Sequence, residues 1–413
     1  MLDSPKPILF RTDRENSACG RCKKPATIEI MRSALLAIFL VFAATAAGQV
    51  IIRPSRFPSI LKQTLDHPEL AQALKCEVTV IKPALNFSFR FQAGYIASVP
   101  LKQYAGPGHA WVLVSKITSD APDAKPVYLV TNASLPDIPK TNQQGEIGGG
   151  YLLGEGRYDV EWTLFDDAKR VCQKRWNIKV ALTAGERKVK TVMPPGTIQE
   201  LSLRGSTYSS PAKDDTRPIR LTIFLHAAPL FPRRTKLRPG DALVLLSGLS
   251  SLLERVPSPS VRLVVFNMDQ QKVLFRHQNF ALESLDQVAQ SINGLELGLV
   301  DYQLLKNRKS SAAFLAELIN KELTEPDRAE VVLFLGPASR FSDKVTQPRP
   351  DEKGSAPFFF HFKFQLPSRR AGDSFPDTIS QTIGKLKGKT IVVYTPGDFA
   401  KAIDQMERYA NTP

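Results

Sequence analysis

Histidine titrates closest to neutral pH, so the histidines are the first candidates for acid–base or metal chemistry. None of them stands in a His-x-x-x-His or His-Glu-x-x-His pair, the spacings that place metal ligands on one helix face. Isolated histidines are more often satisfied inside the fold than used as ligands, and we expect this to hold here. His226 is the strongest exception, because it ends a predicted strand, where open α/β sheets bind ligands. The five histidines are His67, His109, His226, His277 and His361.

Serine and acidic residues give no catalytic pattern either. The Ser-Gly-Leu-Ser-Ser segment at 247–251 lacks the Gly-x-Ser-x-Gly frame and lies inside a predicted helix. Asp166-Asp167 indicates a turn between strands, and we find no carboxylate pair typical of glycoside hydrolysis. We therefore predict a protein that is not an enzyme, with no catalytic residue and no cofactor.

The four cysteines fall into two pairs. Cys19 and Cys22 form Cys-Gly-Arg-Cys, which is at best half of a zinc site. Cys76 and Cys172 remain as an even pair, and in an oxidising compartment they would form a disulfide. We predict this bond.

Residues 31–48 have the three parts of a secretory signal peptide: a basic flank at Arg32, an apolar run over 34–47, and an exit of small residues before Gln49. We expect export to the periplasm or the medium and cleavage before Gln49. Residues 1–30 are interpreted as a mis-set translation start or an extended n-region. The alternative is a protein anchored by an uncleaved N-terminal segment.

The chain then divides by its hydrophobic periodicity. A helical lead-in over 49–75 contains a weak helical pattern from Pro58 to Leu74. Period-2 alternation, as in 87–91 and 158–164, predicts a β-sandwich-like domain over 76–203, with Gly148-Gly149-Gly150 as one of its turns.

A polar linker over 204–218 leads to strands alternating with helices over 219–413. This alternation predicts an α/β doubly wound domain, in which 261–267 and 272–278 form an antiparallel edge hairpin. The fold class is therefore multidomain: a β-sandwich-like domain followed by an α/β domain.

The element order over 219–413 resembles the von Willebrand factor type A domain. The residues that carry the likeness are the strand segments Arg-Leu-Thr-Ile-Phe-Leu at 220–225, Val-Arg-Leu-Val-Val-Phe at 261–266 and Ala-Glu-Val-Val-Leu-Phe-Leu at 329–335. The whole chain is similar to secreted bacterial proteins that join a β-rich region to such a domain.

This resemblance implies a strand-tip surface that could bind a divalent cation through Asp-x-Ser-x-Ser, a Thr and an Asp on three loops. Here the first loop reads His226-Ala-Ala-Pro-Leu, the second contains Asp301 without Thr, and the third contains Ser339 without Asp. One carboxylate is too little to hold Mg²⁺. We therefore predict no metal, and we retain His226, Asp301 and Ser339 as a possible metal-free binding surface.

The net charge of +15 allows an anionic partner. Basic clusters occur at 233–238, 306–309, 369–370 and 385–389, but export argues against nucleic acid. We expect a protein or an anionic envelope polymer as the partner, and no stable membrane span after signal cleavage. The function that follows is a secreted binding or interaction protein. The alternative is an envelope hydrolase whose site assembles from scattered residues.

Overall fold

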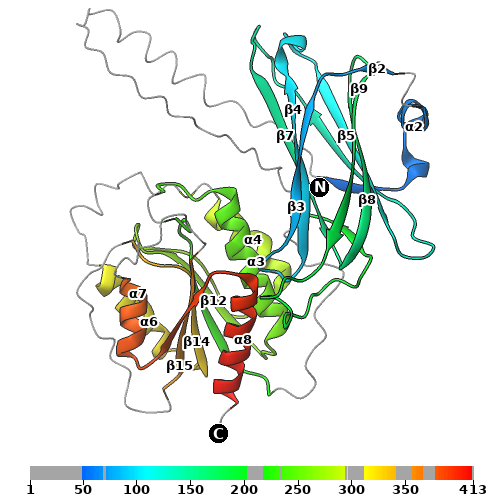
Figure 1. Ribbon diagram of the computed structural model, residues 1–413. Coiled ribbons are helices and arrows are strands. Elements are labelled where there is room, and N and C mark those ends of the chain that lie inside the picture. Colours follow the sequence, from blue (N-terminus) through cyan, green and yellow to red (C-terminus); the bar gives the residue numbers. More distant parts are fainter. Residues whose placement is uncertain are drawn as a thin grey trace, which may run out of the picture. The chain divides into compact units, whose positions relative to one another are not determined.

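A computed structural model of the chain describes residues 49–67, 71–201, 217–231, 234–293, 295, 311–340, 356–365 and 377–411. The predicted signal peptide at 31–48 and most of the predicted linker at 204–218 lie outside these residues. Two compact units can be distinguished (Figure 1). Unit 1 contains 92–181 with the preceding chain up to 84 and the short segment 195–201. Unit 2 contains the chain from 202 onward, together with two earlier segments, 85–91 and 182–194.

Unit 1 is built from two β-sheets. The six-stranded sheet has the order β1-β6-β5-β8-β9-β2, and the four-stranded sheet has the order β10-β7-β4-β3. Pairing in the first sheet is antiparallel apart from β2, which runs parallel to β9. The strands are β1 (Val50–Ile52), β2 (Gln72–Ala73), β3 (Glu77–Leu85), β4 (Phe91–Pro100), β5 (Ala110–Ser119), β6 (Val127–Ser134), β7 (Gln144–Leu153), β8 (Gly156–Asp166), β9 (Arg170–Val180) and β10 (Ile198–Glu200).

The two sheets of unit 1 pack face to face around aromatic rings. Tyr95 of β4 lies with its ring centroid 5.3 Å from that of Trp162 on β8 and 6.5 Å from that of Trp176 on β9. Tyr95 and Trp162 are fully buried. The alternation of apolar and polar residues along β8 therefore has the predicted cause, a buried face that meets the other sheet.

The three glycines at 148–150 lie within β7, so the prediction of a turn there is wrong. Their role is to allow close packing. A Cβ on Gly149 would come within 2.4 Å of Tyr95 Oη, and one on Gly94 within 2.2 Å of the Gly149 carbonyl oxygen. Glycine is the only residue that permits such an approach of backbone and ring.

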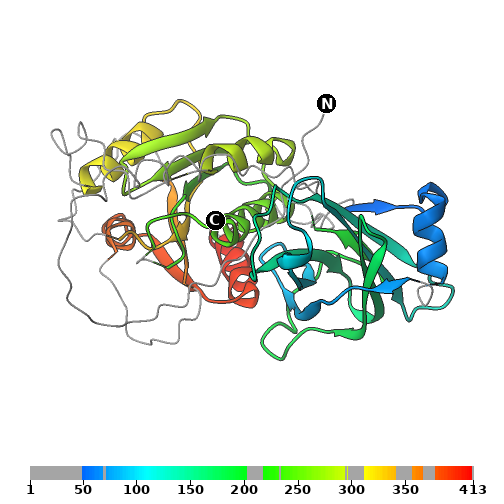
Figure 2. The same ribbon diagram turned by 90° about the horizontal axis from the view of Figure 1, so that it is seen from above.

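The helical lead-in is shorter than predicted. Helix α2 (Ser59–Asp66) ends well before Leu74, and residues 72–73 form β2 instead. Leu61 and Leu65 of α2 pack with Val114 and Val130 of the six-stranded sheet. The helix therefore covers part of the outer face of that sheet (Figure 2).

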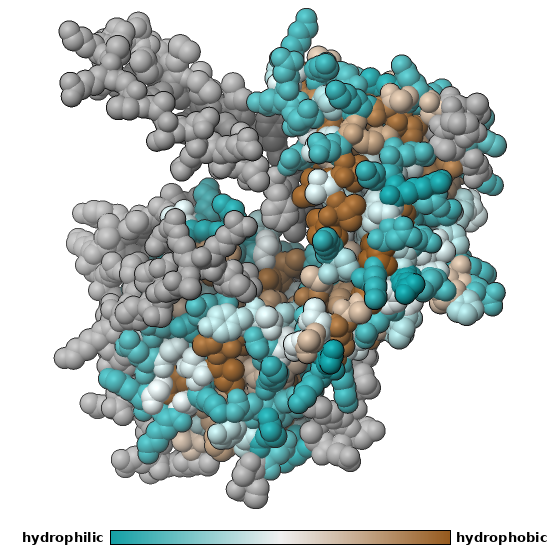
Figure 3. Space-filling model, in the orientation of Figure 1, coloured by the Kyte–Doolittle hydropathy of each residue, from teal (hydrophilic) through white to brown (hydrophobic). Residues whose placement is uncertain are grey.

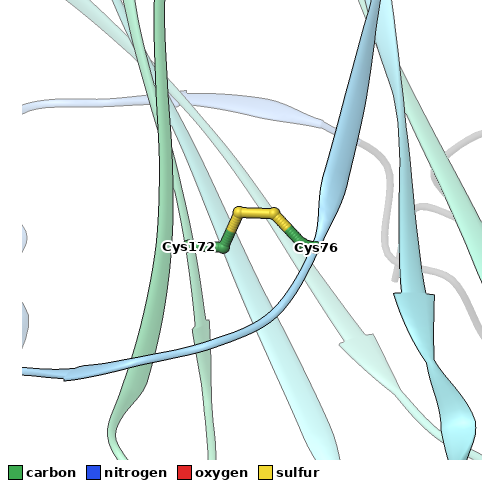
Figure 4. Close-up of a disulfide and its surroundings, with 2 residues drawn as sticks. All are labelled: Cys76 and Cys172. Carbon is green, nitrogen blue, oxygen red and sulfur yellow. A yellow bond between two sulfur atoms is a disulfide. The ribbon is translucent and has the colours of Figure 1, made fainter.

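The predicted disulfide between Cys76 and Cys172 is confirmed (Figure 4). Cys76 directly precedes β3 and Cys172 lies in β9, with 6.2 Å between their Cα atoms. The bond therefore links the edge strand of the four-stranded sheet to the six-stranded sheet.

Unit 2 contains a third sheet with helices on both faces. Its order is β13-β12-β11-β14-β15-β16; all neighbouring strands are parallel except β13, which is antiparallel to β12 as predicted. Every residue of β11, β12 and β14 is buried, as expected of strands covered on both faces. The strands are β11 (Leu221–His226), β12 (Val261–Asn267), β13 (Lys272–His277), β14 (Val331–Pro337), β15 (Phe358–Phe364) and β16 (Lys389–Val393).

The helices of unit 2 agree closely with the segments that the sequence predicts as helical, which are 240–255, 282–292, 310–323, 376–386 and 397–409. Helices α6 and α7 share a core cluster with Phe224 and Phe334, whereas α8 packs Phe399 against Phe362 and Phe364 on the other face (Figure 1). Helix α3 lies on that second face, since Gly248 approaches the Phe364 ring. The helices are α3 (Pro239–Arg255), α4 (Leu285–Ile292), α6 (Ser311–Leu323), α7 (Thr378–Lys385) and α8 (Pro396–Ala410).

Residues 87–90 of the alternating segment form a turn, and only Phe91 belongs to a strand, as the first residue of β4, so the prediction of a strand over 87–91 is wrong. Asn86 Oδ1 accepts hydrogen bonds from the backbone N of Ser88 (3.0 Å) and of Arg90 (3.1 Å). Phe89 adopts a left-handed φ of 54°. Side-chain contacts of this kind stabilise turns, and the alternation reflects burial of the phenylalanine rings rather than an extended backbone.

These rings belong to the core of unit 2. The ring centroid of Phe87 lies 5.0 Å from that of Phe364, and Phe89 stacks on Phe399 at 5.8 Å. Ser251 Oγ of α3 donates a hydrogen bond to the Phe87 carbonyl oxygen (2.6 Å). The segment 85–91 is thus part of the packing of α3, α8 and β15.

Figure 3 shows several apolar areas among hydrophilic ones on this face of the molecule. The exposed large apolar side chains of the described residues include Val50, Ile51 and Ile81 of unit 1. Among the helices that the structure describes, none has the length and apolar character needed to cross a membrane.

Candidate functional site

A cluster of buried polar side chains lies toward the carboxyl ends of β11, β14 and β15, on the face covered by α6 and α7. Parallel strands bring their carboxyl ends to one edge of the sheet, and β11 and β14 are the neighbours at which the strand order reverses. In α/β sheets this edge is the usual position of a ligand site. We therefore treat the cluster as the candidate site.

His226, the last residue of β11, is 2% exposed. Its Nδ1 lies 3.0 Å from the carbonyl oxygen of Pro337, and its ring stacks on Phe266 with centroids 5.2 Å apart. A carbonyl only accepts hydrogen bonds, so Nδ1 carries the proton and Nε2 has the lone pair. Nε2 is buried and has no hydrogen-bond partner among the described residues. Burial lowers the pKa of His226, which makes the imidazole neutral at pH 7.

The approach of β14 to His226 depends on a glycine. Gly336 has a φ of +142°, and a Cβ at this position would lie 2.7 Å from the His226 carbonyl oxygen. Any side chain here would push the two strand ends apart. The position therefore specifies the close pairing that holds His226 against Pro337.

Asp377 is the centre of the cluster. Its side chain caps α7 by accepting a hydrogen bond from Ile379 N (3.2 Å). It also accepts from Ser339 N (3.0 Å) and Ser339 Oγ (3.1 Å) after β14, and from Ser380 Oγ (2.6 Å). Lys363 Nζ of β15 lies 3.4 Å away. One carboxylate therefore ties the loop after β14 to the start of α7 and to β15.

His361 of β15 lies beside this carboxylate and is 1% exposed. Its Nδ1 is 3.0 Å from Ser380 Oγ and 3.8 Å from Asp377 Oδ2. Its Nε2 is buried without a hydrogen-bond partner among the described residues, like that of His226. Burial lowers the pKa of His361 to about 4, against the opposing effect of Asp377.

Burial also acts on Asp377, where it opposes ionisation. The neighbouring His361, the hydrogen bonds from Ser380 and Ser339, and Lys363 outweigh it and lower the pKa of Asp377 below its ordinary value. The carboxylate is therefore ionised, while both imidazoles are neutral at pH 7. The net result is a stable ion pair between Asp377 and Lys363 in a buried setting.

The sequence singled out three residues of this edge. The structure brings His226 and Ser339 to it: Asp377 bonds to Ser339 and acts electrostatically on His226. Asp301 lies outside the described residues.

Sequence reasoning missed Asp377, Lys363 and Ser380, and it named His361 only as one of five histidines without placing it at this edge. The sequence predicts this helix over 376–386, which places Asp377 inside it, whereas α7 begins at Thr378 and Asp377 is its N-cap; an Asp at the start of a helix is a capping signal that could have been recognised. The other three converge only through the register of β15 with β14 and the position of α7, which no local pattern reveals.

The arrangement differs from a hydrolase triad, in which the histidine uses one nitrogen for the acid and the other for the serine. Here a single nitrogen of His361, Nδ1, faces both Ser380 and Asp377, and the Ser380 hydroxyl lies 2.6 Å from the carboxylate. Within the described residues, no group of three or more His, Cys, Asp or Glu side chains is placed to hold a metal ion.

Comparisons with known proteins assign no family. No family model matches the chain, and no curated protein matches it significantly. Solved structures give weak likenesses. A lipoprotein from Bacteroides thetaiotaomicron is 8% identical with a TM-score of 0.14, covering 29% of this chain and 89% of that one. A calcium-binding mutant of β-glucuronidase 2 from Bacteroides uniformis is 12% identical with a TM-score of 0.17, covering 76% of this chain and 38% of that one.

Proposed function

We propose that the chain is an exported binding protein without enzymatic activity, which joins a β-sandwich to a metal-free domain of the von Willebrand factor type A kind. The spatial order of the sheet in unit 2 supports the second part. If the six strands β11 to β16 are numbered 1 to 6 in chain order, their order across the sheet is 3-2-1-4-5-6, and strand 3 (β13) is antiparallel to its neighbour. This is the doubly wound order that the resemblance implies. The disulfide supports export, since such bonds persist in oxidising compartments.

The observation that carries the metal-free assignment is the burial of the loop after β11. His226, Ala228 and Leu230 are 2%, 2% and 5% exposed. They occupy the positions where the resemblance implies oxygen ligands. Asp377, the carboxylate that does lie nearby, already accepts hydrogen bonds from Ser339, Ser380 and the backbone of α7. The cluster therefore braces the edge of the sheet, and recognition would use shape and ordinary polar contacts.

Calorimetry tests the metal-free assignment. We expect no binding heat when the purified full chain is titrated with Mg²⁺ or Mn²⁺, and no rise in its thermal midpoint in their presence, because a bound ligand stabilises the folded state. The chelator-treated protein serves as the control. Micromolar binding of either ion would contradict the proposal.

The partner class is tested by capture from an envelope fraction. The basic cluster at 385–389, with Lys385 and Lys387 exposed at the end of α7, suits an anionic polymer or an acidic protein surface. Binding through such residues should weaken steeply as salt is raised, because exposed charges are screened. A double substitution, Lys385→Gln with Lys387→Gln, should weaken capture; Lys125→Gln, exposed in unit 1, is the control.

One contact favours the alternative of an envelope hydrolase: the 3.0 Å approach of Ser380 Oγ to His361 Nδ1, beside Asp377. A histidine with a pKa of about 4 is a weak general base at pH 7, and Ser380 is already bonded to the carboxylate. We expect no turnover of activated esters, and no change on Ser380→Ala. Turnover that is lost in Ser380→Ala while the protein stays folded would establish the hydrolase instead.

A further inference from the structure

The side chain of Gln49 is fixed by the fold of unit 1. Its Oε1 accepts a hydrogen bond from the backbone N of Gly150 in β7, at 3.1 Å. The amide orientation is unambiguous, since a backbone N–H only donates and must therefore meet the oxygen. The next residue, Val50, begins β1 and pairs with Val130 of β6. Gln49 thus joins the edge strand of one sheet to a strand of the other.

The other end of this amide is poorly accommodated. Gln49 Nε2 is buried and has no hydrogen-bond partner among the described residues. A buried donor without an acceptor is destabilising, because it loses its water and gains nothing in return. The fold therefore uses the carbonyl oxygen of this side chain and leaves its amino group unsatisfied.

Gln49 is also the residue that the proposed signal cleavage would leave at the N-terminus. A free α-amine on glutamine can close a five-membered ring onto its own side-chain amide, so the two groups react intramolecularly. The amine nitrogen attacks Cδ, a C–N bond forms, and the Cδ–Nε2 bond breaks. Nε2 leaves as ammonia with the proton from the amine, and no oxidant or second substrate is needed.

We propose that the mature protein begins with pyroglutamate at residue 49, an inference that rests on the proposed export and cleavage. The lactam keeps the Oε1 carbonyl that accepts from Gly150 and removes the nitrogen that the fold leaves unpaired. It also replaces a charged α-ammonium with a neutral amide at the start of β1. The product suits its surroundings better than the open glutamine does.

The experiment is intact mass measurement on freshly exported full-length protein, followed by tryptic mapping of the peptide 49–56. The expected result is an N-terminus at residue 49 that is lighter by one ammonia and does not react with amine reagents. Gln49→Asn is the matched control: it keeps an amide, but cyclisation would need a strained four-membered ring. This variant should start at residue 49 with a reactive amine.

The outcomes separate the two claims. A peptide that starts at an open, amine-reactive Gln49 overturns the modification and leaves cleavage intact. A mature chain that retains residues 31–48 overturns both the modification and the proposed cleavage. A start at another residue downstream of 31 overturns the modification and the cleavage site before Gln49, but leaves the proposed export intact.

Discussion

His361 combines near-complete burial with a titratable ring, and this has a consequence for pH. Its pKa is about 4 in the folded protein and 6.5 when unperturbed. Between these values the unfolded chain binds a proton that the folded chain does not, so the free energy of unfolding falls as pH falls from 6.5 to about 4. His226, whose pKa is also lowered by burial, acts in the same direction. Above pH 6.5 this contribution is fully present.

Chemical denaturation as a function of pH measures this effect. We expect a loss that approaches about 3 kcal/mol from His361 at pH 4, from the size of the pKa difference. His361→Gln removes the titration and should flatten this part of the profile, whereas His67→Gln, exposed in unit 1, should not. An unchanged slope in His361→Gln would refute the assignment.

Asp377 allows a second test at the residue scale. Asparagine at this position keeps the size of the side chain but removes the charge that pairs with Lys363 and two of the acceptor positions. We expect Asp377→Asn to lower the free energy of unfolding by about 2 kcal/mol, the value of a buried hydrogen bond to a charged group. Asp398→Asn, a partly exposed residue in the capping box of α8, should cost less than about 1 kcal/mol. Equal losses would contradict the central role of Asp377.

Single residues were predictable where position alone identifies them. His226 was found because it ends a buried strand, and the Cys76–Cys172 bond was found because the two cysteines form the remaining pair. His361 and Ser380 could not be found, since their contact depends on how α7 lies on β15. A sequence records neighbours along the chain, whereas this cluster is formed by neighbours across a sheet.

At the scale of elements, periodicity located most strands and helices of unit 2 within a few residues, because buried parallel strands form continuous apolar runs. The same reasoning failed at residues 87–90, where a turn shows the alternation of apolar and polar residues that is typical of a strand. It failed again at Gly148–Gly150, where glycine serves packing against Tyr95 rather than chain reversal.

Phe87, in the turn before β4, packs its ring into the core of unit 2. Its ring contacts Phe364 and Phe399 in the core of unit 2 and is 6% exposed. We expect Phe87→Ala to destabilise unit 2 by about 3 to 5 kcal/mol, the usual cost of an aromatic cavity. Phe358→Ala, at a residue 47% exposed, should cost well under about 1 kcal/mol. Thermal unfolding followed by a probe in unit 2 measures the two losses. Equal thermal midpoints for Phe87→Ala and Phe358→Ala would contradict the role of the Phe87 ring in the core of unit 2.

For the whole molecule, the disulfide closes a loop with a sequence separation of 96 residues. Opening it releases chain entropy in the unfolded state. We expect the double variant Cys76→Ser, Cys172→Ser to lose about 4 kcal/mol of stability, detected as a lower denaturation midpoint of unit 1. Wild type under reducing conditions should match the variant, and a midpoint that stays unchanged in both would show that the bond contributes little.

The fragment 219–413 tests the composition of unit 2. It contains the complete sheet but lacks 85–91 and 182–194. Phe364 and Phe399 would lose the rings that cover them, and exposed aromatic clusters of this kind promote association. We expect the fragment to aggregate or to bind a hydrophobic dye in size-exclusion and fluorescence measurements. A monodisperse, dye-negative fragment would show that those segments are dispensable.

The assignment of early residues to the later unit also limits how such a protein can change over evolutionary time. A gene rearrangement that transferred only the second half to a new host protein would leave behind residues that complete its interior. Recombination at the polar stretch near 204–218 would therefore yield damaged products on both sides. The two halves are constrained to be inherited together, although neither shares a sheet with the other.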